Sequence, residues 1–375
     1  MSLEAYIDIR FGDPVISLSL NYEGLVYGSM MGRLLYYNFY TKEERVINEL
    51  SEEYIPGVWL SYDNVLYAAI GDQKAMIVVN PDAPRFQKQY VLHEKLHNSV
   101  NCELTQVQMH HDTVCLFTLD PPKEDMQEEF VQSVLPIYLN HLSTQIQEHI
   151  EGIRFPAYTM PFDFDGNCLL YMEWEQSGLR TLKMFYMTPN PRLVQVSSFD
   201  KSYGKVSFAR FLNDSIVYVH KRKTLKILDI NSGEEKATLG SHRAEVVALS
   251  VVTLQKVQPP NQRRNHRGRL DDAMYENSNE EIEESVHESQ IENLKTVVIS
   301  ADSSGCICVW ESTSVIDIIK ISELPQLTPQ YQKKQYFSMG YPYTIQAFGP
   351  RIAISTDLGV LVIKSKALES IQYNC

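Results

Sequence analysis

Residues 296–311 read Thr-Val-Val-Ile-Ser-Ala-Asp-Ser-Ser-Gly-Cys-Ile-Cys-Val-Trp-Glu. Two short runs rich in Val, Ile and Cys flank a polar Asp-Ser-Ser-Gly segment. Runs of β-branched residues are typical of strands, and a short polar segment that ends in glycine is typical of the turn between antiparallel strands. The stretch therefore predicts a β-hairpin whose second strand ends near Trp310.

This second strand has counterparts along the whole chain. Each is an apolar run, and the position that closes it falls at residues 38, 80, 140, 187, 229, 311 and 365. The shortest spacings, from 38 to 80 and from 187 to 229, are 42 residues, which matches a repeated four-stranded unit of roughly 40–45 residues. The longer spacings require insertions. The pattern predicts seven such units.

A glycine supports the same register in three copies. Gly32, Gly305 and Gly359 each stand five residues before the equivalent position of the apolar run that follows them. The main competing interpretation concerns residues 124–150, where apolar residues have near-helical spacing. Pro136 would interrupt a helix there, and the segment from Ile137 onward repeats the strand pattern, so strands are favoured.

One copy carries further residues in a recognisable order. Gly240-Ser241-His242 opens it, an apolar run follows at 246–249, Ser300 lies in the next run, and Trp310-Glu311 closes it. In this order the copy resembles a WD repeat, which has a Gly-His start, a serine in its second strand and a Trp-Asp end. The resemblance implies an all-β fold: a single closed seven-bladed β-propeller of four-stranded antiparallel blades over residues 1–375.

The resemblance also implies a structural hydrogen-bond network. In WD repeats a His, a Ser, a Trp and an Asp of the turn form a buried chain, and the matching positions here are His242, Ser300 and Trp310. Ser304 occupies the position of the turn Asp, so we expect the hydrogen-bonded chain of side chains to be weaker or to be linked through water. Two segments compete to complete the last blade: the alternating run at 5–9 and the tail at 368–373.

Two charged segments interrupt the repeats. Residues 121–130 predict an acidic hairpin loop in blade three. Residues 256–293 hold a basic cluster and then an acidic stretch, with too few apolar residues to offset the entropy of ordering, which predicts a disordered insertion between the first two strands of blade six. Such an insertion is either a tolerated surface loop or a docking segment with phosphorylation sites at Ser278, Ser285 and Ser289.

Composition limits the classes of partner. The net charge is −13, which disfavours nucleic acid and anionic membranes because both require clustered Lys and Arg. No stretch approaches the ~18 apolar residues of a membrane span. The six cysteines have no CxxC spacing and are expected to be reduced thiols. With no basic, apolar leader at the N-terminus, these features predict an intracellular, cytoplasmic protein.

The sequence contains few motifs that indicate catalysis or the binding of a cofactor or metal. It has no phosphate-binding glycine loop, no Gly-x-Ser-x-Gly and no His-Glu-x-x-His, so we expect no catalytic, cofactor or metal residues. His110 and His111 are adjacent and would point to opposite faces of a strand. Cys306 and Cys308 share a face and are expected to be packing residues. Trp59 and Trp174 are expected to pack between blades.

The expected function is a non-catalytic scaffold that binds other proteins in a multi-subunit assembly, without a small-molecule substrate. One alternative is a substrate receptor of a ubiquitin ligase, although the stretch at 310–313 lacks the arginine of Trp-Asp-x-Arg. A phosphoinositide-binding propeller would need Phe-Arg-Arg-Gly, which is absent. A propeller enzyme could use Asp163, Asp165 and Glu173 in a central channel.

Overall fold

The chain is described by a computed structural model in which nearly all regular structure is strand. The structure describes residues 1–8, 13–49, 54–61, 63–70, 75–81, 88–91, 103–110, 113–120, 131–138, 153–155, 159–174, 179–186, 192–199, 206–254, 295–332, 335–338 and 343–374.

The described strands form seven four-stranded antiparallel sheets, numbered here in chain order. The first contains β2 (Val15–Leu20), β3 (Gly24–Ser29), β4 (Arg33–Asn38) and β5 (Glu44–Glu49). The second contains β6 (Gly57–Leu60), β7 (Leu66–Ile70), β8 (Ala75–Val79) and β9 (Lys88–Val91). The third contains β10 (Glu103–His110), β11 (Thr113–Asp120), β12 (Val131–Tyr138) and β13 (Ile153–Phe155).

The remaining sheets follow the same pattern. The fourth contains β14 (Thr159–Phe164), β15 (Cys168–Trp174), β16 (Arg180–Tyr186) and β17 (Arg192–Phe199). The fifth contains β18 (Ala209–Leu212), β19 (Ser215–His220), β20 (Thr224–Asp229) and β21 (Glu235–Ser241). The sixth contains β22 (Val246–Leu254), β23 (Lys295–Asp302), β24 (Cys306–Glu311) and β25 (Ser314–Lys320).

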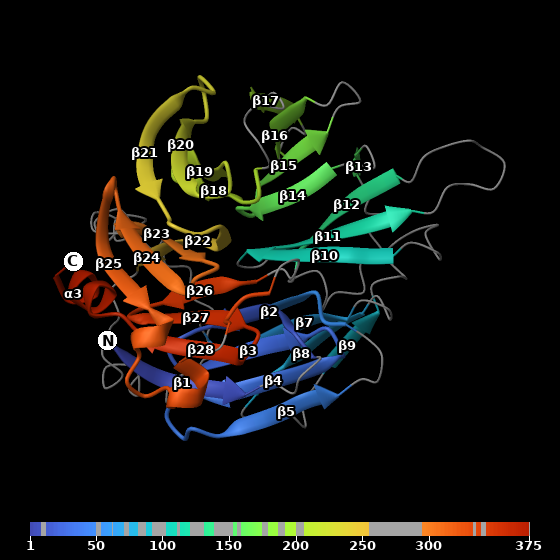
Figure 1. Cartoon of the computed structure of the whole chain (residues 1–375). Coiled ribbons are helices and arrows are strands. Elements are labelled where there is room, and N and C mark those ends of the chain that lie inside the picture. The colour runs from blue at the N-terminus through green and yellow to red at the C-terminus, as the bar shows by residue number, and fades with distance from the viewer. Residues whose placement is uncertain are drawn as a thin grey trace, which may run out of the picture.

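The seventh sheet joins the two ends of the chain. It contains β26 (Ile345–Phe348), β27 (Arg351–Thr356), β28 (Gly359–Lys364) and β1 (Ser2–Asp8), with β1 paired to β28. In Figure 1 the blue strand β1 accordingly lies beside the red strand β28. The N-terminal run therefore completes the last sheet, as one of the two interpretations predicted. The competing tail is wrong, because residues 366–374 form the helix α3 (Lys366–Asn374).

Two short helical segments precede the seventh sheet. They are the 3₁₀ helix η7 (Ile321–Glu323) and α2 (Pro329–Gln332). Residues 131–138 form a strand, and they are the only part of the predicted segment 124–150 that the structure describes; Pro136 lies opposite Cys115 of β11. β13 pairs only with residues 132–134 of β12, so the missing N–H of Pro136 falls beyond that pairing. The predicted segments 121–130 and 256–293 lie outside the described residues.

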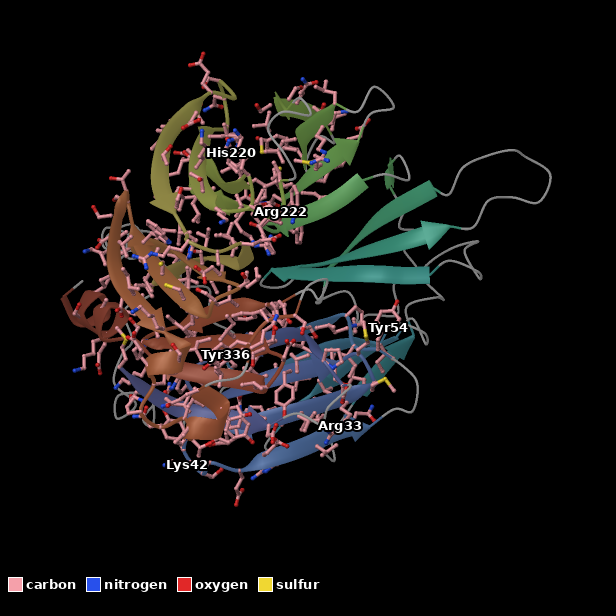
Figure 2. All side chains as sticks on the ribbon, in the orientation of Figure 1. Arg33, Lys42, Tyr54, His220, Arg222 and Tyr336 are labelled. Carbon is pink, nitrogen blue, oxygen red and sulfur yellow. The ribbon has the colours of Figure 1, made fainter. Side chains whose placement is uncertain are left out.

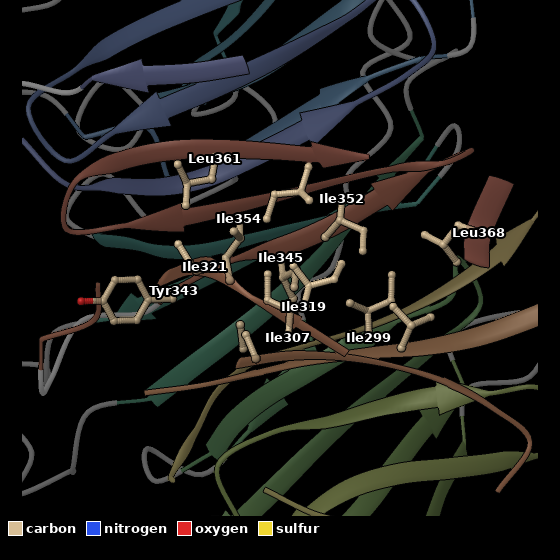
Figure 3. Packing of buried hydrophobic residues seen from close by; sticks show 14 of the residues in the cluster. Ile299, Ile307, Ile319, Ile321, Tyr343, Ile345, Ile352, Ile354, Leu361 and Leu368 are labelled. Carbon is tan, nitrogen blue, oxygen red and sulfur yellow. The ribbon is translucent and has the colours of Figure 1, made fainter. Parts of the chain in front are cut away.

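The cores lie between neighbouring sheets, because both faces of the middle strands are apolar. In β24, Ile307 and Val309 pack toward the seventh sheet, whereas Cys308 and Trp310 pack toward the fifth. Successive side chains of a strand point to opposite faces of the sheet, and here both faces are apolar because each packs against a neighbouring sheet. Figure 3 shows Ile299 and Ile319 of the sixth sheet facing Ile352 and Ile354 of the seventh, all fully buried.

The inner strands follow one another in a cycle. Each first strand contacts the first strand of the next sheet, in the order β2, β6, β10, β14, β18, β22 and β26. β26 in turn contacts β2. Among the described residues, buried cores lie between the fourth and fifth, fifth and sixth, sixth and seventh, seventh and first, and first and second sheets.

Candidate functional site

A buried chain of polar side chains lies where the fifth sheet meets the sixth. Nε2 of His242 is 2.7 Å from Oγ of Ser300, and the indole N–H of Trp310 donates to the same Oγ at 2.8 Å. Nδ1 of His242 is 3.1 Å from a carboxylate oxygen of Asp302. All four residues are buried. The structure thus brings His242, Ser300 and Trp310 together around one hydroxyl.

The acid of this chain is Asp302, which the sequence interpretation missed. That interpretation assigned the turn position to Ser304, but Ser304 donates from both its N–H and its hydroxyl to Asp302, at 3.0 and 2.5 Å. The N–H of Cys306 donates to the same oxygen at 3.2 Å. No water link is needed, and the signal that could have identified Asp302 is its place at the start of the turn that Gly305 closes.

Electrostatics keep Asp302 ionised. Burial alone would raise the pKa of its carboxyl, but the hydrogen bonds from His242 and Ser304 outweigh burial and leave the pKa below its ordinary value. Because an ionised carboxylate only accepts, a neutral His242 carries its proton on Nδ1 and accepts the Ser300 hydroxyl at Nε2. Every polar group of the chain is then satisfied, which is the condition for tolerating it in a core.

The turn before this chain has an unusual backbone. Lys221 and Arg222 connect β19 to β20 with φ values of 48° and 65°. Two consecutive left-handed residues define a tight hairpin turn that favours Asn-Gly, because in this conformation a Cβ lies too close to the following carbonyl oxygen. The N–H groups of Val246 and His242 donate to the carbonyls of Arg222 and Lys223 at 2.7 and 2.9 Å. The sixth sheet thus holds the turn in place.

Four basic side chains gather at this turn. We call Lys221, Arg222, Lys223 and Arg243 the basic turn cluster; all four are exposed. Nζ of Lys223 donates to the carbonyl of Arg243 at 2.9 Å, which joins the two segments. Arg222 pairs with Glu245 at 3.2 Å, and their side chains are 54% and 36% exposed. Within the described residues no acid pairs with the other three cations.

The corresponding turn of the first sheet is apolar. Met30 and Met31 connect β3 to β4, and their side chains are 46% and 52% exposed. The N–H of Met30 donates to the carbonyl of Pro14 at 2.9 Å, and that of Met31 donates to the carboxylate of Asp13 at 3.1 Å. The backbone of the turn is therefore fixed while two flexible apolar side chains face water.

Two cysteines lie next to the buried chain. The sulfur atoms of Cys306 and Cys308 are 4.0 Å apart on one face of β24, and ligand atoms of both lie within 4.8 Å of His242. Both ring nitrogens of His242 already bond to Asp302 and Ser300, which leaves the imidazole no lone pair for a metal. The hydrogen bond with Cys308 lowers the pKa of Cys306 to about 7, and the same bond and burial raise that of Cys308.

The carboxylates considered for a channel enzyme do not converge. Asp163 accepts the N–H of Phe211 at 2.8 Å and joins the fourth sheet to the fifth. Burial raises its pKa, and the charge of Arg210 offsets part of the rise. Asp165 accepts backbone N–H groups within the β14–β15 turn, and Glu173 pairs with Lys183 at 2.5 Å. Each of the three carboxylates has its own structural partner.

The other residues singled out in the sequence are scattered. Trp59 is half-buried on β6, in the second sheet. Trp174 and His110 end β15 and β10, but their side chains lie outside the described part, as does His111 altogether. Among the helices that the structure describes, none has the length and apolar character needed to cross a membrane.

These features define a protein of the β-propeller class. The WD40 β-propeller domain of Doa1 is similar over 97% of this chain and 96% of that domain, with a TM-score of 0.55 at 10% identity. The computationally designed Ika8 protein aligns with 95% of this chain, with a TM-score of 0.49 at 13% identity. No family model and no curated protein matches the sequence. The likeness to Doa1 shows the fold alone.

Proposed function

We propose that this chain is a non-catalytic scaffold that binds other proteins, built on a closed seven-bladed propeller over residues 1–375. The cycle of contacts from β2 to β26 and back to β2 supports closure, as does the pairing of β1 with β28. The likeness to the Doa1 domain supports the WD40 class. The scattered spacing of the six cysteines supports a reducing, intracellular compartment.

The observation that carries the proposal is the turn at Met30 and Met31. Exposing two large apolar side chains on a fixed turn has a cost in water that a covering partner would remove. Methionine adapts its shape to a contact surface because its side chain is unbranched and flexible. The turn is backed by buried Asp13 and Pro14, so it presents these side chains without first having to be ordered.

The test is affinity capture of the tagged full-length protein from a native extract, followed by mass spectrometry. We expect stoichiometric protein partners, and we expect Met30→Ser with Met31→Ser to reduce their recovery. The matched control is Tyr40→Ser, because Tyr40 is 64% exposed at the opposite end of the same sheet. Absence of any stoichiometric partner for the wild-type protein would contradict the scaffold function.

A further inference from the structure

The basic turn cluster is at odds with the charge of the whole chain. The protein carries 47 acidic and 34 basic residues, yet Lys221, Arg222, Lys223 and Arg243 lie together at the junction of two sheets. Figure 2 shows Arg222 on the yellow fifth sheet, beside His220. Glu245 forms a partly exposed ion pair with Arg222, which water screens in part.

The backbone makes the cluster more specific than a random group of surface cations. Left-handed backbone conformations strain a non-glycine residue, and this turn has two in succession. Asn-Gly would form the same turn with less strain. The turn instead carries Lys and Arg, whose long side chains add nothing to the core because they are exposed. The strain therefore accompanies a charged surface rather than better packing.

The cluster is also held ready for binding. The carbonyls of Arg222 and Lys223 accept N–H groups of the following sheet, and Lys223 bonds to the carbonyl of Arg243. His242, which precedes Arg243, is anchored in the buried chain through both ring nitrogens. A ligand would therefore meet cations on a fixed frame and would pay little to order them.

We propose that the basic turn cluster binds an acidic peptide segment of a partner protein, through carboxylate or phosphate groups that contact Lys221, Arg222, Lys223 and Arg243. This inference rests on the proposed scaffold function and names the chemistry of one partner site. A short acidic segment fits better than a long polyanion. Screening confines the favourable field to about 10 Å at moderate salt, so the cluster attracts only a short stretch of a polyanion, and the rest of a nucleic acid or an anionic membrane would lie close to a protein surface whose net charge is −13.

The turn itself provides a test that does not confuse binding with folding. Lys221→Asn combined with Arg222→Gly removes two charges and installs the residues that the turn geometry favours, so the melting temperature should stay equal or rise. The matched control is Lys42→Asn. Lys42 is also exposed with a left-handed φ of 58°, but it lies between β4 and β5, at the opposite end of the strands. Figure 2 shows it beside the blue first sheet, far from Arg222.

Binding is measured by fluorescence anisotropy on the full-length protein. The probes are a labelled peptide of alternating Glu and Ser, the same peptide with phosphoserine, and a Gln-Ser counterpart. We expect both acidic peptides to bind, the neutral one not to bind, and the affinity to fall as salt is raised. The double variant should bind about tenfold more weakly, because it loses two of the four charged contacts. Lys42→Asn should bind like the wild type.

Three results would overturn the inference: no binding of either acidic peptide, equal binding by the double variant, or tighter binding of a duplex DNA of matched charge. Capture from extract separates this failure from that of the scaffold function. If the wild-type protein and the double variant recover the same partners, and the double variant binds the acidic peptides equally well, the scaffold stands and the basic site falls. If the wild type recovers none, the scaffold function itself fails.

Discussion

The indole N–H of Trp310 donates to Oγ of Ser300 at 2.8 Å inside a core where Ser300 is fully buried. Ser300→Ala would leave the Trp310 donor and a nitrogen of His242 without partners. We expect the free energy of unfolding to fall by about 2–4 kcal/mol, because each buried orphan group costs roughly 1–3 kcal/mol. Urea unfolding followed by tryptophan fluorescence measures it. Ser314→Ala, at an exposed position of the same sheet, should change little.

Asp302 should make stability depend on acid pH. Its folded-state pKa lies below the ordinary value, so its contribution is complete above the unfolded pKa of about 4 and is lost as the pH falls through the lower, folded pKa. Asp302→Asn should destabilise the protein by about 1–3 kcal/mol at neutral pH. Unfolding curves of the two proteins should converge on acidification, and a difference that stays constant to low pH would contradict the assignment.

Arg351 should stabilise the junction of the two chain ends. Its guanidinium donates to both carboxylate oxygens of Glu4 on β1, at 2.7 and 2.8 Å, and lies 4.4 Å from the ring centre of Phe39. Arg351→Lys keeps the charge but loses the paired geometry, so we expect a loss of about 1–2 kcal/mol in thermal unfolding. Arg45→Lys is the control, because Arg45 contacts Glu43 through one nitrogen at 3.4 Å and the Glu43 side chain is 63% exposed. Equal effects of the two changes would contradict a special role for Arg351.

Gly359 should be sensitive to any side chain. Its φ is +132°, and a Cβ there would stand 2.0 Å from the carbonyl oxygen of Ile7. Gly359→Ala must displace β1 or bend β28, so we expect a loss of at least about 2 kcal/mol and faster amide exchange along β1. Asp8→Ala, at the exposed partner position, should have little effect on either measurement. Unchanged exchange in Gly359→Ala would show that the close approach is absent.

Cys306 should be the more reactive of the neighbouring thiols. Its pKa is lowered to about 7 by the hydrogen bond with Cys308, so roughly half of it is thiolate at neutral pH. Alkylation by iodoacetamide, mapped by mass spectrometry, should modify Cys306 before Cys308, with a midpoint near pH 7. Cys308→Ala removes this hydrogen bond and should move that midpoint upward, and an unchanged midpoint would contradict the assigned cause.

Much of the strand pattern could be predicted from the sequence, and the reason is periodicity. The positions that close the apolar runs coincide with the ends of third strands, as at Asn38, Asp229 and Glu311. Alternation along a strand is local information, and glycine marks the turns at Gly32 and Gly305, whose φ values are 82° and 84°. Such features need no knowledge of the tertiary contacts.

The site was harder to predict because it depends on what meets in space. The turn holds several short polar residues, and the choice of Asp302 over Ser304 is made by His242, 60 positions away. Likewise, the basic turn cluster combines the β19–β20 turn with Arg243, which only the pairing of neighbouring sheets brings together. The tail at 368–373 cannot be the outer strand because β1 already occupies the edge of β28. This pairing joins residues that are distant in the sequence, so no local pattern reveals it.

The pairing of β1 with β28 has a consequence for how the protein is made. Residues 2–8 are synthesised long before their partners at 359–364. At about 5–20 residues per second, the first strand waits on the order of 20–70 s with an unpaired edge. During this interval the nascent chain exposes a strand that is prone to aberrant pairing, so protection during translation, rather than the stability of the finished fold, should limit the yield of the protein in cells.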